Sequence, residues 1–415
     1  MTAASEAPDP STQAFTYRNF RFYWLATLST SFAVQIMSVA VGWQIYDITR
    51  DPIYLGLVGL AQFLPALLLV LVTGLVADKL PRQRIMQACL AIELACAAAL
   101  LLFATLQGYA VWPIFLVLVA LGTARAFMNP AASSLAPNLV PAPALANAIS
   151  MNVTAWQLAS ILGPVAGGLL YGISGPVAYG TAALLVMVSF VSISLVQAPA
   201  QNDDGHETSI GTLLAGVRYI FSEKIVLGAI SLDLFAVLMG GAVALMPVFA
   251  RDILEVGPWG LGLLRAAPGI GAILTALWLV KFPIRDNAGI VLFAFVAGFG
   301  FFTLVFGLSQ TVWLSVPMLA LIGACDMVSV SIRETIMQLW TPDAVRGRVN
   351  AVNSVFIGAS NELGEFRAGM MAALIGTQAA VAFGGVATIA VAGIWGAAFP
   401  GLRRQKSLDR KMVEG

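Results

Sequence analysis

The chain has 415 residues, of which 59% are hydrophobic and only 10% are charged. A water-soluble domain carries about 25% charged residues, because water must solvate its surface. The composition therefore excludes an ordinary soluble domain. The formal net charge of +1, without a basic cluster interleaved with aromatics, gives no indication of a nucleic-acid partner.

Residues that commonly hold metals or cofactors are scarce in the chain. Cys89, Cys96 and Cys325 all lie inside apolar runs, where a thiol packs as a small hydrophobic group. The single histidine, His206, lies in a polar connector, which leaves no histidine at membrane depth to ligate haem. We therefore expect no cofactor and no metal centre. No nucleophile–base pair or phosphate loop indicates an enzyme.

Long apolar runs follow one another along the chain and predict an all-α polytopic membrane protein. Such runs match the hydrocarbon thickness, and in lipid each backbone N–H needs a partner inside its own segment. Residues 1–17 are polar, lack a signal-peptide pattern and are expected to form a disordered tail. Transmembrane helices, twelve in all, are expected at 20–46, 53–77, 84–106, 111–133, 144–171, 176–196, 225–249, 259–281, 288–309, 312–335, 347–375 and 378–399.

Lysine and arginine in the short loops orient these helices. Alternate connections carry nearly all the basic residues, whereas the opposite set holds only Arg50 and Arg251. The basic side is the cytoplasmic side. We therefore expect both termini, including the basic tail of residues 400–415, to lie in the cytoplasm, and the helices to cross the inner membrane of a bacterial cell.

A polar, acidic connector follows the sixth helix at residues 197–209. Beyond it, apolar residues recur at helical spacing from Ile210 to Phe221 and predict a short amphipathic helix at the cytoplasmic membrane surface. Residues 197–224 would then link the two halves of the chain. A disordered linker is the alternative.

The two halves repeat each other at a fixed offset of 201 residues. Because one offset holds over a long stretch, duplication explains the matches better than coincidence does. The repeat predicts two pseudo-symmetric six-helix bundles, residues 18–196 and 225–399, with a substrate site between them near mid-membrane. The matched pairs are Trp112 and Trp313, Gly122 and Gly323, Pro141 and Pro342, Asn152 and Asn353, Gly163 and Gly364, and Gly168 and Gly369.

The loop between the second and third helices contains Gly74, Asp78, Lys79, Arg82 and Arg84. This pattern, a glycine followed by an acid and basic residues at a tight turn, resembles the signature loop of the major facilitator superfamily. Asp78 ends a helix at the cytoplasmic face, where a carboxylate could meet the positive N-terminal end of the eleventh helix. The resemblance implies a latch that favours the state closed to the cytoplasm. The alternative is a topology signal alone.

Two further patterns resemble the same superfamily. In the fifth helix, Gly163, Pro164, Gly167 and Gly168 look like its GPxxGG antiporter motif, in which proline bends the helix and glycines admit a close neighbour. In the fourth helix, the spacing from Leu121 to Arg125 resembles the motif that carries the intramembrane arginine of proton-coupled exporters. A tight helix crossing is the simpler interpretation of GPxxGG.

The strongest resemblance lies in the second half, in the segment from Arg333 to Phe366. It looks like the branch of the major facilitator superfamily that contains the bacterial enterobactin exporter, and the resemblance covers nearly the whole chain. This implies a twelve-helix transporter that exports a small molecule. The partners implied are a small-molecule substrate, protons and the lipid bilayer, and we expect a monomer.

Charged side chains inside the hydrocarbon are costly, so they usually face a cavity and have a partner. The repeat pairs Arg125 with Asp326, and Asp233 lies in the seventh helix. We expect Asp326 or Asp233 to be the proton-titrating carboxylate and Arg125 to modulate it; a static ion pair is the alternative. Further charges at membrane depth are Glu93, Arg265, Glu362, Glu365 and Arg367, and we expect structural roles for the three in the eleventh helix.

Candidate substrate contacts are aromatic and amide side chains, which suit an amphipathic ligand. We therefore predict a secondary transporter that couples export of such a molecule to proton entry by alternating access. A symporter or facilitator that imports a metabolite, and a membrane subunit or sensor that does not transport, are the alternatives. The substrate stays open among siderophores, drugs, lipid-like metabolites and metal chelates. The candidate substrate-binding residues are Gln35, Asn129, Trp156, Gln157 and Phe235.

Overall fold

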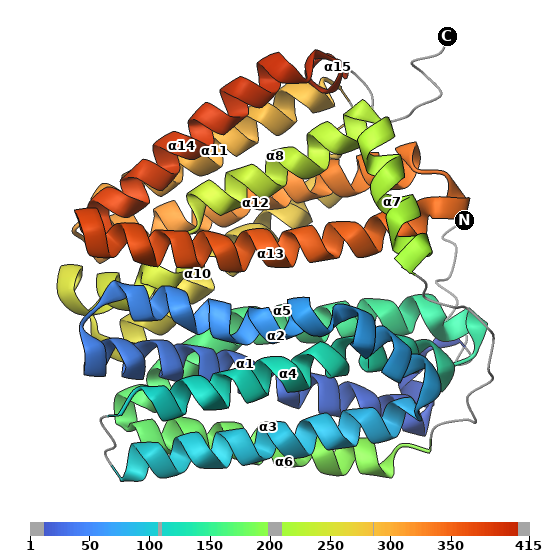
Figure 1. Ribbon diagram of the computed structural model, residues 1–415, viewed down its shortest axis with the longest axis vertical. Coiled ribbons are helices and arrows are strands. Elements are labelled where there is room, and N and C mark those ends of the chain that lie inside the picture. The colour runs from blue at the N-terminus through green and yellow to red at the C-terminus, as the bar shows by residue number, and fades with distance from the viewer. Residues whose placement is uncertain (1–11, 107–109, 198–209, 285, 406–415) are drawn as a thin grey trace, which may run out of the picture. The chain divides into compact units, whose positions relative to one another are not determined.

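The computed structural model of the chain describes residues 12–106, 110–197, 210–284 and 286–405. These ranges are helical almost throughout and contain no strand, which confirms the predicted all-α polytopic fold. The long helices in chain order are α1 (Arg18–Thr49), α2 (Pro52–Lys79), α3 (Arg82–Thr105), α4 (Trp112–Leu135), α5 (Leu145–Ile173), α6 (Gly175–Leu195), α8 (Lys224–Gly240), α10 (Gly257–Lys281), α11 (Ala288–Leu308), α12 (Val312–Trp340), α13 (Asp343–Ile375) and α14 (Thr377–Ala398) (Figure 1).

Within the described residues, eleven helices are long and apolar enough to cross a membrane. The remaining long helix, α13, has 33 residues but carries charges near its start and in its middle, so its composition alone does not mark it as a span. Its start at Asp343 is four residues before the predicted one. The other predicted boundaries fall within a few residues of the observed ends, except in the seventh span.

The seventh predicted span, 225–249, falls within the apolar segment Lys224–Ile253, but this segment is not one continuous α-helix. α8 ends at Gly240, and the chain continues through the short turns η5 (Val243–Leu245), α9 (Met246–Val248) and η6 (Phe249–Ile253). The break follows from Gly240 and Gly241, where backbones approach closely. A Cβ on Gly240 would lie 2.8 Å from Thr388 Oγ1, and one on Gly241 would lie 3.2 Å from the Gly364 carbonyl carbon.

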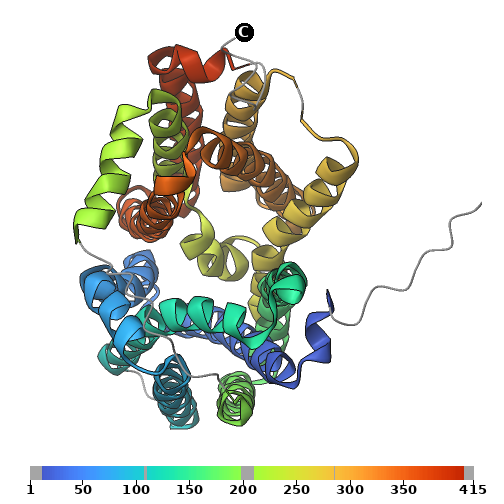
Figure 2. The ribbon, with the colours of Figure 1, turned by 90° about the vertical axis from the view of Figure 1, so that its right-hand side faces the viewer.

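The chain divides into two compact units. Unit 1 comprises residues 1–40 and 64–206, and unit 2 comprises residues 41–63 and 207–415. Unit 2 therefore contains the second half of the chain together with the end of α1 and the start of α2. Figure 2 views many of the long helices along or close to their axes, whereas α7 of unit 2 lies across the long helices of its unit.

Within unit 1, α3 packs between α4 and α6. The start of the described chain is packed as well, although residues 1–17 were expected to form a tail. Residues Ala14–Thr16 form the short helix η2, Ala14 is fully buried, and its backbone N–H donates to Asn147 Oδ1 of α5 at 2.9 Å. Phe15 meets the Trp24 ring edge-on at 5.1 Å between centroids. Residues 1–11 lie outside the described ranges.

Within unit 2, α11 packs against α12 and α14, while α8 packs against α13 and α14. The linker helix α7 (Ile210–Ser222) packs against α13. The Tyr219 hydroxyl of α7 donates a hydrogen bond to the Trp340 carbonyl oxygen of α12 at 2.5 Å. A Cβ on Gly216 of α7 would lie 2.8 Å from the Arg348 carbonyl oxygen of α13. The linker helix is therefore attached to the end of α12 and the start of α13, and residues 198–209 before it lie outside the described ranges.

Candidate functional site

A buried ion pair joins α8 to α12 in unit 2. Arg333 Nη1 lies 2.6 Å from Asp233 Oδ2, and both side chains are at most 11% exposed. Arg333 Nε also donates to Ser329 Oγ at 3.2 Å. The hydroxyl one turn away thus helps to hold the guanidinium against the carboxylate, and the pair fixes α8 against α12.

Asp326 completes this group of charges. It lies on the same face of α12 as Ser329 and Arg333, because these three residues are separated by helical spacings of three and four. Asp326 interacts electrostatically with both Arg333 and Asp233. Two carboxylates and one guanidinium therefore share one buried region, which we call the Asp233–Asp326–Arg333 cluster.

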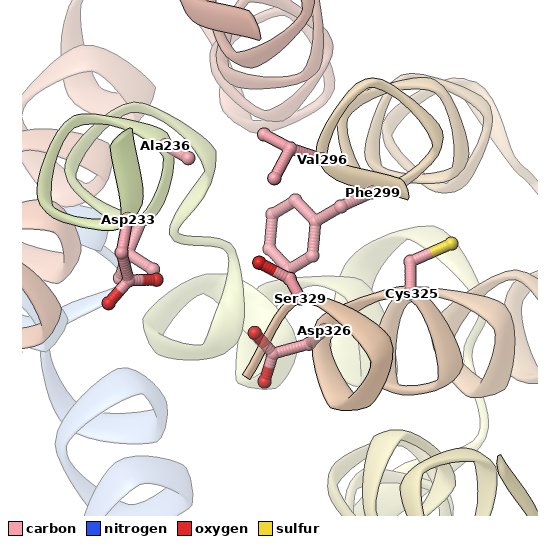
Figure 3. Close-up of a pocket in the computed structure, with 8 residues that line it drawn as sticks. Asp233, Ala236, Val296, Phe299, Cys325, Asp326 and Ser329 are labelled. Carbon is pink, nitrogen blue, oxygen red and sulfur yellow. The ribbon is translucent and has the colours of Figure 1, made fainter. Parts of the chain in front are cut away.

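A small, partly open cavity of about 10 Å³, which has room for roughly one water molecule, adjoins the cluster. Figure 3 shows Asp233 reaching it from α8, Asp326, Ser329 and Cys325 from α12, and Val296 and Phe299 from α11. Pockets that hold drug-sized ligands enclose about 300–1,000 Å³. This cavity is smaller, so it suits water and proton exchange at the carboxylates better than it suits a whole amphipathic substrate.

Arg333 was not among the predicted coupling residues, although it begins the segment from Arg333 to Phe366 that resembles the exporter branch of the superfamily. The signal that could have found it is its spacing: seven residues separate it from Asp326, so both lie on one helix face. The cation that the structure places beside Asp233 and Asp326 is thus Arg333. The predicted modulator, Arg125, belongs to unit 1.

Arg125 lies on α4 and interacts electrostatically with Glu93 of α3. Glu93 is 2% exposed, and Thr30 Oγ1 of α1 donates to Glu93 Oε2 at 3.2 Å. Unit 1 therefore has its own interacting acid and base, a buried Glu93 and a half-buried Arg125, and with Thr30 they involve three of its helices. A single unpaired charge inside the membrane costs free energy, which explains why each unit has an intramembrane arginine beside a carboxylate.

The GPxxGG residues of α5 form a close crossing with α1, and all four are buried. A Cβ on Gly163 would lie 2.6 Å from Gln35 Cβ, and one on Gly167 would lie 3.0 Å from Ile36 Cα. The second half repeats this arrangement. A Cβ on Gly364, the repeat partner of Gly163, would lie 2.9 Å from the Val237 carbonyl oxygen of α8. The internal repeat thus extends to the packing of equivalent helices.

The latch residues lie where α2 ends and α3 begins. Lys79 and Arg84 are exposed, and a Cβ on Gly74 would meet no atom within 4 Å. Arg82 Nη1 donates to the Ser134 carbonyl at the end of α4 at 2.9 Å, so it fixes the loop within unit 1. The side chain of Asp78 lies outside the described residues, and its predicted role at the eleventh helix stays a prediction.

Arg367 of α13 stabilises the break in α8. Its Nε donates to the Leu238 carbonyl at 2.8 Å and its Nη2 to the Met239 carbonyl at 2.5 Å. These carbonyls belong to the last turn of α8, where the helix no longer supplies all their partners. A guanidinium also suits the negative end of a helix dipole. Arg367 therefore acts on the backbone of a discontinuous helix.

Glu362 and Glu365 of α13 face the start of α2. A Cβ on Gly59 would lie 3.4 Å from Glu365 Oε2 and closer still to Glu362 Oε2. Glu365 also interacts electrostatically with Arg265 of α10. The two carboxylates thus lie side by side in unit 2.

The candidate substrate contacts fall into different surroundings. Gln35 packs under Gly163, and Phe235 packs on Trp395 with 4.9 Å between ring centroids. Trp156 is 60% exposed on α5, and Asn129 of α4 is exposed as well. Gln157 is half-buried and accepts a hydrogen bond from Ser160 at 3.4 Å. Phe235 is 38% exposed despite its contact with Trp395. Trp156, Asn129 and Phe235 are therefore the exposed candidates, whereas Gln35 and Gln157 are half-buried.

Unit 2 also contains an ion-pair network that the sequence did not reveal. Arg251 pairs with Asp47, Arg50 lies 3.5 Å from Asp252 and 3.7 Å from Asp47, and Tyr46 donates to Asp252. The two arginines are the ones that depart from the positive-inside pattern. Each is beside an aspartate, so these exceptions join the end of α1 to η6.

Known proteins resemble this chain in fold and sequence. It is 28% identical over 346 residues to the enterobactin exporter EntS of Escherichia coli O1:K1, covering 81% of each chain. Among solved structures, the nucleoside transporter NupG matches with a TM-score of 0.71 and 13% identity, over 92% of this chain and 100% of that one. An inward-facing bacterial homologue of the human lysosomal transporter Spinster matches with a TM-score of 0.69 and 15% identity, over 92% and 96% of the chains.

The described part of the chain contains twelve long helices in two repeated halves, with buried charges in each half. Together with the similarity to known proteins, this defines a polytopic transporter of the major facilitator superfamily and not an enzyme. The family described as transmembrane secretion effectors matches residues 11–412. The chain belongs to this family. It is a multi-pass membrane protein that transports a small molecule.

Proposed function

We propose that this transporter exports a small amphipathic molecule, such as a siderophore or a drug, in exchange for protons by alternating access. The Asp233–Asp326–Arg333 cluster is the observation that carries the proposal. It puts two carboxylates and one guanidinium beside a small cavity inside the second half of the chain. The similarity to an enterobactin exporter supports the direction of transport.

The cluster can couple a proton to a change of conformation through its charge. With both carboxylates ionised its charge is −1, and with one proton on Asp326 it is zero. A net charge is costly in a dry interior, so the ionised cluster favours a state in which water reaches the cavity. Protonation biases the conformations unequally, which is the requirement for a proton to drive transport.

Several predicted features complete the proposal. The cytoplasmic location of both termini puts the basic loop of Lys79, Arg82 and Arg84 inside the cell, where the latch would stabilise the state closed to the cytoplasm. Trp156, Asn129 and Phe235 are the candidate substrate contacts best placed to meet a ligand, because all three are exposed on their helices. The protein would work as a monomer.

Proteoliposomes with an acidic lumen and a trapped pH dye test this function. Enterobactin and ethidium are added outside as the siderophore and drug probes, and protein-free liposomes correct for passive entry. Exchange predicts that the probe accumulates inside while the lumen becomes more alkaline. Further acidification of the lumen would indicate an importing symporter. No probe-dependent flux with either compound would contradict export of these classes and favour a protein that does not transport.

A further inference from the structure

Glu362 and Glu365 are half-buried titratable groups that the proposed coupling cluster does not use. They are one turn apart on α13 and face the same point of α2. Both Oε2 atoms lie within 3.4 Å of the position that a Cβ on Gly59 would occupy. Gly59 is buried, and only a glycine leaves room for two carboxylates there.

Two ionised carboxylates at one site repel each other strongly, so such a pair favours holding one proton between them. The charged groups around this pair, among the described residues, are two arginines. Arg265 of α10 interacts with Glu365. Arg367 of α13 is directed to the Leu238 and Met239 carbonyls and to Met371 Sδ. Arg265 favours an ionised carboxylate at the pair, and the repulsion between the two carboxylates favours one proton on the pair.

The pair lies beside a close helix crossing within unit 2. A Cβ on Gly56, three residues before Gly59, would lie 2.9 Å from Phe366 Cα, and one on Gly369 would lie 2.9 Å from the Pro52 carbonyl oxygen. The start of α2 is thus packed backbone to backbone against α13. A charge change at Glu362 and Glu365 acts directly on this crossing.

We propose that Glu362 and Glu365 form a second proton-binding site, in which the two carboxylates share one proton opposite Arg265 at the α2–α13 crossing. The site is separate from the Asp233–Asp326–Arg333 cluster, since it lies between α2, α10 and α13. If the site takes part in transport, it adds a second proton to the proposed function, and that role rests on the proposed function. The binding of a proton at this site does not depend on any transport activity.

Proton uptake by the purified protein in lipid nanodiscs tests this site. The protein is titrated from pH 8 to pH 5 without substrate, and Glu362→Gln/Glu365→Gln is compared with the unaltered chain. A shared site predicts that the double variant takes up about one proton fewer. Two ordinary exposed glutamates would account for only about 0.3 proton over this range, and a loss that small would overturn the proposal.

The single variants sharpen the result. If one proton is shared, Glu362→Gln and Glu365→Gln each remove nearly the whole of it, because the remaining carboxylate can ionise beside Arg265. Independent groups would each remove half, which would contradict sharing. If the double variant does not fold, Gly59→Ala takes its place, because the new Cβ displaces the Glu362 carboxylate. Gly393→Ala is its control, since a Cβ there meets no atom within 4 Å. Equal uptake by the two alanine variants would refute the site.

Failure of this proposal and failure of the proposed function are distinguishable. The titration needs no substrate, so a missing proton in the double variant supports the second site even when neither probe is transported. Conversely, coupled transport with unchanged proton uptake in the double variant removes the second site and leaves the first.

Discussion

Replacing Arg333 with methionine removes the guanidinium from the Asp233–Arg333 pair and keeps much of its volume. The charges of a pair with 2.6 Å between nitrogen and oxygen are centred about 4 Å apart, which gives about 4 kcal/mol of attraction at an effective dielectric constant near 20. Breaking a buried pair on one side costs about 3–5 kcal/mol, because the other charge stays buried. We therefore expect Arg333→Met to lower the free energy of unfolding by about 3–5 kcal/mol.

Equilibrium unfolding in mixed detergent micelles measures this loss, with exposed Arg218→Met as the matched control. The double variant Asp233→Asn/Arg333→Met should recover at least about 2 kcal/mol of it, because replacing both partners removes the uncompensated charge. A loss below about 1 kcal/mol in Arg333→Met would refute the reasoning. So would a double variant as unstable as the single one.

Three further substitutions test the packing and charges of the two units. Gly163→Ala puts a Cβ 2.6 Å from Gln35 Cβ and should lower the free energy of unfolding by about 1–3 kcal/mol. Gly172→Ala in the same helix has open space around the new Cβ and should not lower it. Equal melting temperatures for the two variants would argue against the crossing. Glu93→Gln leaves the Arg125 charge without its carboxylate and should cost about 3 kcal/mol in the same unfolding assay, and an unchanged value would show that the two do not pair. Arg367→Met leaves two carbonyls at the end of α8 without their donor and should cost about 1–3 kcal/mol; proteolysis at the break should become faster, and unaltered cleavage would contradict the capping role.

Much of the fold follows from local sequence patterns. Apolar runs and Gly and Pro residues in the loops predicted the ends of the long helices, apart from the seventh, to within about five residues. They could do so because the hydrocarbon thickness sets the length of a helix regardless of its partners. The break after Gly240 did not follow from them. It depends on Thr388, Gly364 and Arg367, which are more than 120 residues away in sequence.

The candidate site was predictable in part for a similar reason. Asp233 and Asp326 stand out as charges in apolar helices, so the cost of burial alone marks them. Arg333 was not predicted as their cation because the repeat pairs Arg125 with Asp326, whereas the ion pair forms between α8 and α12 within one unit. The modulating role of Arg125 stays a prediction. Glu362 and Glu365 were expected to have structural roles. Their proximity to Gly59 depends on the α2–α13 packing, which the spacing along α13 does not reveal.

Asp326→Asn tests the central claim most directly, because asparagine keeps the size of the side chain and removes its titration. Accumulation of labelled enterobactin driven by a pH gradient is compared, in the same proteoliposomes, with exchange of labelled for unlabelled enterobactin without a gradient. The variant is predicted to retain exchange and to lose gradient-driven accumulation. Accumulation that stays equal to that of the unaltered protein would contradict a coupling role for the Asp233–Asp326–Arg333 cluster.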